Sequence, residues 1–119
     1  MIVGVNHVQV NVPSDALHRA REFYVGFMGM REIPRPATFT SKGIWLNAGM
    51  FEIHIGVEDG VDRMKTRAHV AYQVSDLSIW REKVPAAGYK MKDQPLIAGY
   101  DRFQFRDPFG NTIEIIQRL

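Results

Sequence analysis

The segment Phe105-Arg-Asp-Pro-Phe-Gly-Asn-Thr-Ile-Glu-Ile-Ile116 indicates the fold more specifically than any other part of the sequence. Its Asp-Pro and Gly-Asn dipeptides are typical of a tight turn, because proline presets one backbone dihedral and glycine or asparagine tolerates the left-handed one. The β-branched run after the turn predicts a strand. In that strand Glu114 alternates with isoleucines, so this single carboxylate is expected to lie on the face opposite the apolar side chains.

The overall composition is that of one ordinary globular domain. The chain has 119 residues, of which 45% are hydrophobic and 24% charged, and its formal net charge is +2. The basic residues are scattered, which argues against a surface for nucleic acid or membrane. The absence of cysteine excludes disulfides, thiolate zinc sites and a cysteine nucleophile. Without a signal-like N-terminus or a membrane-spanning apolar run, the sequence predicts a cytoplasmic protein that binds neither nucleic acid nor membrane.

The first half of the chain is predicted to contain one strand, one helix and three further strands. The first strand alternates apolar and polar side chains, with His7 on its polar face. A helix is expected from an N-cap at Ser14 to a C-terminal stop at Gly29. The last strand of this half alternates again and places Glu52 and His54 on its polar face. The expected strands cover residues 3–12, 30–33, 39–46 and 50–55.

The second half repeats this layout after a polar, glycine-bearing linker at residues 56–66. It begins with another histidine-led alternating strand, and a helix is expected from about Leu77 to Ala87, ended by the next glycine. The expected strands cover residues 67–76, 89–92, 102–106 and 112–116. The sequence therefore predicts two modules, residues 1–58 and 67–119, within one domain.

Two polar residues recur at the same spacing in both modules. His69 follows His7 by 62 residues, and Glu114 follows Glu52 by the same 62. The neighbours agree as well, because both histidines precede a valine and the two glutamates lie in Phe-Glu-Ile and Ile-Glu-Ile. The shared spacing and facing indicate one common role for the four residues.

Two imidazoles and two carboxylates on the polar faces of curled sheets form a suitable ligand set for one divalent ion. Two nitrogen and two oxygen ligands, with positions left for water, suit zinc, nickel, cobalt, manganese or ferrous iron. Open positions of this kind are what catalysis at a metal requires. For each residue alone, a hydrogen-bonded or solvent-facing side chain is the simpler interpretation. That interpretation predicts neither the common spacing nor the common face.

Three further residues are candidates for the surroundings of the ion. His54 lies two residues after Glu52, and three roles are open to it: it replaces Glu52 as a ligand, supports the ligand, or contacts substrate. Its counterpart in the second module is an isoleucine, which argues against a ligand role. Trp45 is a candidate aromatic wall of a substrate pocket, with core packing as the alternative. Arg102 is a candidate anchor for an anionic or oxygen-rich substrate, with pairing to a neighbouring aspartate as the alternative.

The chain resembles the vicinal oxygen chelate superfamily, which contains glyoxalases, bleomycin resistance proteins and extradiol dioxygenases. The resemblance covers nearly the full length. Its most specific motifs are Asn-His7-Val, Phe-Glu52-Ile, Ala-His69-Val and the closing Asp-Pro-Phe-Gly-Asn-Thr-Ile-Glu114. It implies an α+β fold of two tandem βαβββ modules with a curved, mostly antiparallel sheet, and metal ligands at these four numbered positions. It also implies a homodimer, often with each metal site built from one module of each subunit.

The resemblance also implies a metal-dependent enzyme that binds a small substrate through two adjacent oxygens. The favoured hypothesis is a glyoxalase I-like lyase or isomerase, in which Glu114 acts as the base and Glu52 is the alternative base. An extradiol-type dioxygenase and a fosfomycin-type thiol transferase are two alternatives. A metal-free drug-binding protein of the bleomycin resistance kind is the third, and the complete ligand set argues against it.

Overall fold

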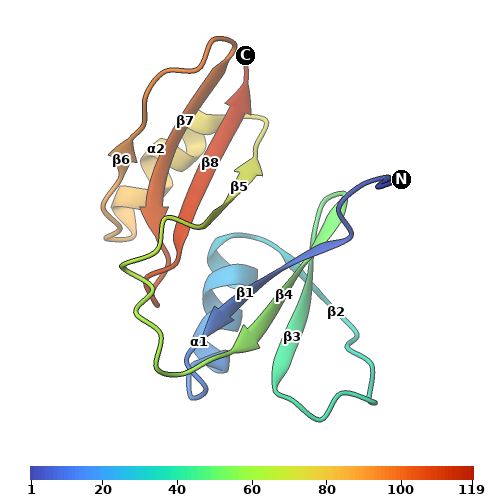
Figure 1. Cartoon of the computed structure of the whole chain (residues 1–119). Helices are drawn as coiled ribbons and strands as arrows, with labels where there is room; N and C mark the ends of the chain where they lie inside the picture. The colour runs from blue at the N-terminus through green and yellow to red at the C-terminus, as the bar shows by residue number, and fades with distance from the viewer. The chain divides into compact units, whose positions relative to one another are not determined.

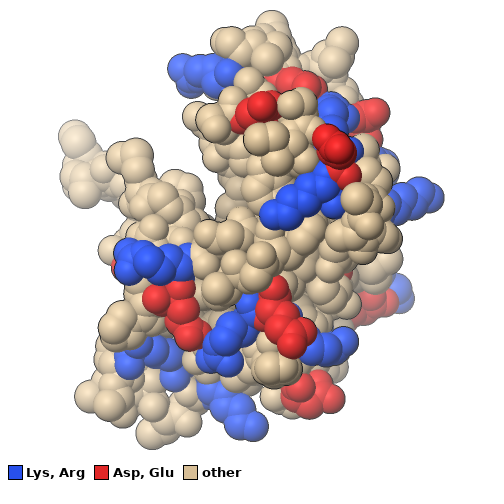
Figure 2. All heavy atoms as spheres, turned by 180° about the vertical axis from the view of Figure 1, so that it is seen from behind, with Lys and Arg blue, Asp and Glu red and all other residues tan.

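The computed structural model describes residues 1–119, which divide into two compact units, Met1–Val61 and Asp62–Leu119. Each unit contains a four-stranded mixed sheet with a helical segment between its first and second strands, as Figure 1 shows. This arrangement confirms the predicted α+β fold of two βαβββ modules. None of the helices is long and apolar enough to cross a bilayer. On the face drawn in Figure 2, basic and acidic side chains are interspersed, in agreement with their scattered positions in the sequence.

Unit 1 has the strand order β1-β4-β3-β2. The β1–β4 pair is parallel, whereas the other two pairs are antiparallel. The predicted strand at 39–46 is displaced, because the proline-bearing segment before residue 43 forms a loop. The elements are β1 (His7–Val12), α1 (Leu17–Arg21), the π-helical turn η1 (Glu22–Phe27), β2 (Arg31–Ile33), β3 (Gly43–Ala48) and β4 (Phe51–Val57).

Unit 2 has the corresponding strand order β5-β8-β7-β6, again with one parallel pair, β5–β8, and two antiparallel pairs. Its β6 strand is only two residues long. The elements are β5 (His69–Gln73), α2 (Leu77–Ala86), β6 (Lys92–Asp93), β7 (Tyr100–Arg106) and β8 (Thr112–Arg118).

The two helices begin in different ways. The prediction that Ser14 caps the first helix is wrong, because α1 follows Ala16, which makes no side-chain cap. The backbone N–H and hydroxyl of Ser14 instead donate to the carboxylate of Asp59, at 2.9 and 2.6 Å. In contrast, Asp76 caps α2 by accepting the Ser78 N–H at 2.9 Å.

One face of each sheet carries the apolar core. In unit 1 the helical segment packs on β3 and β4, and in unit 2 α2 packs on β8. The side chains that alternate onto this face are almost fully buried, and each such burial contributes about 1.5–3 kcal/mol. Because the side-chain period of a strand is two, the opposite face of each sheet remains for polar residues. The buried strand residues include Ile44, Leu46, Ile53 and Ile55 in unit 1 and Phe103, Phe105, Ile113 and Ile115 in unit 2.

The predicted turn before β8 is built around one buried carboxylate. Asp107 Oδ1 accepts the backbone N–H groups of Phe109 and Asn111, at 2.9 and 2.8 Å, and Oδ2 accepts Asn111 Nδ2 at 2.8 Å. Gly110 has a φ of +101°, which explains the glycine at this position. The turn therefore fixes the start of β8 and the face on which Glu114 lies.

Replacing Asp107 with alanine is expected to lower the free energy of unfolding by about 3 kcal/mol, because partly buried donors lose a charged acceptor. Urea denaturation followed by circular dichroism measures this loss. Asp62→Ala is the matched control, since Asp62 also accepts a backbone N–H, from Met64 at 3.0 Å, but is exposed. Equal effects of the two substitutions would contradict the structural role of the buried carboxylate.

Candidate functional site

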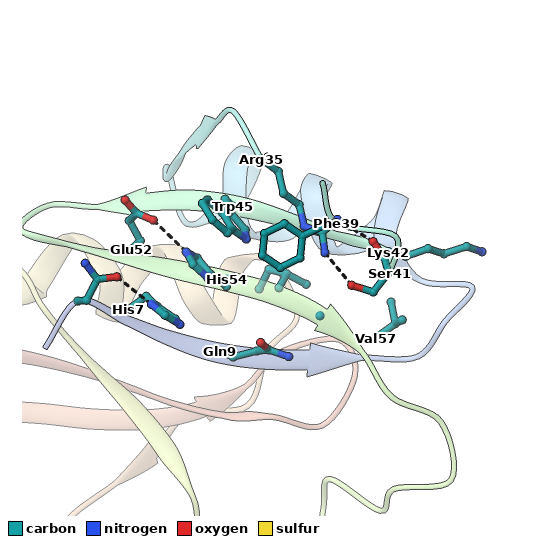
Figure 3. A pocket seen from close by; sticks show the side chains of 13 residues that line it. His7, Gln9, Arg35, Phe39, Ser41, Lys42, Trp45, Glu52, His54 and Val57 are labelled. Carbon is teal, nitrogen blue, oxygen red and sulfur yellow. Dashed lines mark hydrogen bonds and ion pairs between the residues drawn. The ribbon is translucent and has the colours of Figure 1, made fainter. Parts of the chain in front are cut away.

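The polar face of the unit 1 sheet is arranged in three rows, set by the register of β1, β4 and β3. Figure 3 shows this face, with His7 and Glu52 toward one end and His54 and Trp45 in the middle. The last row has glycine on both β4 and β3. The rows are His7, Glu52 and Asn47; Gln9, His54 and Trp45; and Asn11, Gly56 and Gly43.

Both predicted histidine ligands are held in the same tautomer. His7 Nδ1 lies 2.8 Å from the Asn6 side-chain oxygen, and His69 Nδ1 lies 3.0 Å from the backbone oxygen of Arg67. An amide oxygen accepts hydrogen bonds only, so each Nδ1 is the donor and each Nε2 carries the lone pair. Metal-binding histidines are commonly oriented in this way, by a hydrogen bond from the nitrogen that does not bind the ion.

Glu52 and Glu114 each have one oxygen tied to the protein. Glu52 Oε1 lies 2.9 Å from His54 Nε2. Glu114 Oε1 accepts hydrogen bonds from Arg102 Nη1 at 3.0 Å and Gln104 Nε2 at 3.1 Å. Neither Oε2 takes part in a hydrogen bond or an ion pair, so each carboxylate keeps one oxygen for a ligand or a proton.

His54 is enclosed between two other rings. Its ring stacks on that of His7 at 4.0 Å and 14°, and on that of Trp45 at 4.1 Å and 4°. Only 8% of the residue is exposed. The in-plane lone pairs of stacked rings do not converge, so His7 and His54 are not arranged to bind one ion together. Of the three roles open to His54, this geometry favours support of Glu52.

In unit 2, His69 lies next to Glu114, although the two are not paired residues of β5 and β8. Ala71, not His69, is opposite Glu114 on the parallel pair, whereas His7 is opposite Glu52 in unit 1. A shift of two residues keeps a side chain on the same face. His69 Nε2 accordingly lies 3.5 Å from Glu114 Oε1.

Arg102 neutralises the buried carboxylate of Glu114, which is 4% exposed. Its Nη2 donates to the Pro95 backbone oxygen at 2.9 Å, and its buried Nε has no partner. The alternative that Arg102 pairs with a neighbouring aspartate is wrong, since Asp101 binds Arg81 at 2.9 Å. If Arg102 binds substrate, it does so while it also binds the carboxylate of Glu114.

The donor set in each unit fits half of a divalent-metal site. No three histidine, aspartate or glutamate side chains form a complete metal site within either unit. Each unit alone presents one histidine Nε2 and one glutamate with an open oxygen. His69 Nε2 lies 3.5 Å from the tied oxygen of Glu114, Oε1, so the histidine lies beside the carboxylate whose other oxygen is open.

A pocket of about 570 Å³ opens over the polar face of unit 1. Trp45, predicted as an aromatic wall, lines it together with His7, Glu52 and His54. Phe39 contacts Trp45 edge to face at 5.5 Å and extends the aromatic wall. The lining residues that were not predicted include those of the loop between β2 and β3, which are Arg35, Phe39, Ser41 and Lys42.

Two residues that were not predicted did have a signal in the sequence, Arg35 in unit 1 and Gln104, which holds Glu114 in unit 2. Arg35 continues the alternation of β2, because Arg31, Ile33 and Arg35 are spaced by two. Gln104 alternates with Phe103 and Phe105 on β7, which places it on the same face as Glu114. Phe39, Ser41 and Lys42 had no such signal, since a loop has no periodicity.

Comparisons with known proteins agree with this architecture. Residues 4–115 match the family model described as the Glyoxalase/Bleomycin resistance protein/Dioxygenase superfamily. A Bacillus anthracis protein assigned to the glyoxalase family shares 37% sequence identity, with a TM-score of 0.90, and the match covers 100% of this chain and 98% of that one. No curated protein matches.

The fosfomycin resistance protein FosX of Listeria monocytogenes has the same fold. It is 23% identical, with a TM-score of 0.80, over 100% of this chain and 96% of that one. The FosX variant E126Q, complexed with Mn(II) and 1S,2S-dihydroxypropylphosphonic acid, is 22% identical, with a TM-score of 0.82, and covers 100% and 95% of the two chains. The extent of the family match, together with the repeated modules, shows that the chain belongs to the glyoxalase/bleomycin resistance protein/dioxygenase superfamily.

Proposed function

We propose that the chain is a metal-dependent enzyme that binds a small substrate through two adjacent oxygens. His7, Glu52, His69 and Glu114 are the proposed ligands of one divalent transition-metal ion. The observation that carries this proposal is the matched state of the two units. In each, an oxygen acceptor holds histidine Nδ1 and leaves Nε2 open, and the glutamate has one oxygen tied and one open.

The favoured reaction is a glyoxalase I-like proton transfer, catalysed by a lyase or isomerase. When bound, the ion supplies electrophilic stabilisation of negative charge on the two adjacent substrate oxygens. Glu114 is the proposed base. Arg102 and Gln104 fix its Oε1, so Oε2 is the open atom, and it would take the proton once substrate has displaced it from its place as a ligand. Glu52 is the alternative base, and His54 holds its Oε1 in the same manner.

We further propose that the active protein is a homodimer in which each metal site combines unit 1 of one subunit with unit 2 of the other. The half ligand set in each unit supports a site that combines a unit 1 with a unit 2.

Elemental analysis of chelator-free protein tests the metal proposal. The parent is expected to hold about one transition-metal ion per site, and the double variant His7→Ala, His69→Ala to hold none. His18→Ala is the matched control, because that histidine is exposed and pairs only with Glu22, at 2.9 Å. Zinc, nickel or cobalt would favour isomerisation, and iron would favour the dioxygenase alternative.

Manganese belongs in the reconstitution series because a FosX structure is complexed with Mn(II). A parent protein that takes up none of these ions after reconstitution would overturn the proposal. It would leave the metal-free binding protein as the better hypothesis, with the four residues as a polar lining of its pocket.

A further inference from the structure

At the end of the unit 1 pocket away from His7 and Glu52, two glycines let neighbouring side chains lie close against the backbone of the sheet. Gly43 and Gly56 are opposite each other there. A Cβ added to Gly43 would lie 3.2 Å from Arg35 Nη2 and 3.3 Å from Arg35 Nε. The Arg35 guanidinium therefore lies directly over the Gly43 backbone, in space that any other residue at position 43 would fill.

Arg35 is held in place by neutral groups. Its Nη1 donates to the Ser41 backbone oxygen at 2.7 Å, and its Nη2 donates to Ser41 Oγ at 3.0 Å. The guanidinium also lies 4.7 Å from the centre of the Phe39 ring. Its Nε is buried without a partner. Because a guanidinium has five N–H donors, most of its hydrogen-bonding capacity is still unused.

Two basic side chains at this end of the pocket have no carboxylate partner. Arg35 and Lys42 both line the pocket, and neither pairs with a carboxylate. Other arginines of the chain do have such partners: Arg21 pairs with Glu32, and Arg81 pairs with two aspartates. A buried or half-buried cation normally has an anionic partner, so the missing anion at Arg35 points to a ligand.

The charged end and the proposed metal ligands lie well apart on the same face. Glu52 and Gly56 are four residues apart on β4, which corresponds to about 13 Å at a rise of about 3.3 Å per residue. Figure 3 shows Trp45 and His54 between His7 and Glu52 at one end and Arg35, Ser41 and Lys42 at the other. A ligand that reaches both ends must be elongated, with a middle part that passes the aromatic side chains.

We propose that Arg35, Lys42 and Ser41 bind an oxyanion group of the substrate, a carboxylate or a phosphate-type group. The substrate is then an elongated anion on the order of 10 Å long, with adjacent oxygens at one end and the anionic group at the other. This inference rests on the proposed function for the oxygen-bearing end. The anion subsite itself consists only of unit 1 residues that make no contact with the proposed ligands.

Calorimetric titration of the metal-loaded protein with matched probes tests this inference. The first probe is 4-(3,4-dihydroxyphenyl)butanoate, which has two adjacent oxygens at one end and a carboxylate at the other. Its primary amide is the neutral comparison. The corresponding phosphonate is the third probe, and tighter binding of the phosphonate than of the carboxylate would identify the phosphate-type group as the natural one.

The parent is expected to bind the acid about 10-fold or more tightly than the amide, because a charge-assisted hydrogen bond is lost in the amide. In Arg35→Gln and in Lys42→Gln the preference for the acid is expected to fall to about 3-fold or less. Lys65→Gln is the matched control, since Lys65 is exposed and lies in the other unit. It should keep the full preference.

Equal affinity of the parent for acid and amide would overturn the anion subsite, and so would an unchanged preference in both Arg35→Gln and Lys42→Gln. Lys42 is exposed, so its variant still gives a result if Arg35→Gln does not fold. Failure of the metal proposal gives a different result: His7→Ala, His69→Ala would then bind both probes as the parent does. The preference for the acid would still depend on Arg35.

Discussion

The variant Glu114→Gln is expected to bind metal at least about 100-fold more weakly than the parent and to lose measurable turnover. Glutamine keeps the shape of the side chain, and its oxygen still accepts hydrogen bonds from Arg102 and Gln104. It has neither the negative charge that attracts a divalent ion nor the basicity to take a proton at Oε2. The loss is therefore chemical, and no large change in packing accompanies it.

The fold of this variant should persist, because Ile113 and Ile115 carry the packing of β8 on the opposite face. Its stability should fall by about 1–3 kcal/mol, since Arg102 loses its only anionic partner in a half-buried position. Metal titration and thermal denaturation measure the two effects. Glu32→Gln is the matched control, because Glu32 pairs with Arg21 at the surface and should affect neither metal nor turnover.

Metal affinity and turnover equal to those of the parent in Glu114→Gln would remove Glu114 from both proposed roles. Turnover that is lost with metal affinity retained would leave Glu114 as base only. The ligand set would then consist of His7, Glu52 and His69.

The fold could be predicted from the sequence because its local signals occur in both halves of the chain. Strand alternation and strong turn residues recur at the same spacing, and both modules form as expected. The side chains of β8 also lie on the predicted faces of the sheet, since Ile113 and Ile115 are buried toward the helix and Glu114 lies on the other side. Side-chain period and turn chemistry are local properties, so a sequence reveals them directly.

Interactions that depend on contacts distant in sequence were not predictable in the same way. Ser14 has the right chemistry for an N-cap, yet it binds Asp59, which lies 45 residues later. Nothing local indicates that His54 is enclosed between His7 and Trp45, because that stack joins three strands. In each case tertiary contact decides between roles that the sequence leaves open.

A mixed dimer tests how the ligand pairs are combined. One subunit carries His7→Ala, in unit 1, and its partner carries His69→Ala, in unit 2. If each site combines unit 1 of one subunit with unit 2 of the other, one site of the mixed dimer loses both histidines and the second keeps all four ligands. If each site uses both units of one chain, every site lacks one histidine. The two arrangements therefore differ in the number of intact sites.

We expect the mixed dimer, purified through a different tag on each subunit, to hold about one ion and about half of the parent's activity. The two homodimeric variants are the controls, because every one of their sites lacks one histidine in either arrangement. Both should be nearly free of metal and inactive. A mixed dimer as inactive as these controls would exclude sites shared between subunits, and elution as a monomer at working concentration would exclude the dimer itself. Recovered activity requires unit 1 of one chain to act with unit 2 of another, because no chain in the mixture has both histidines.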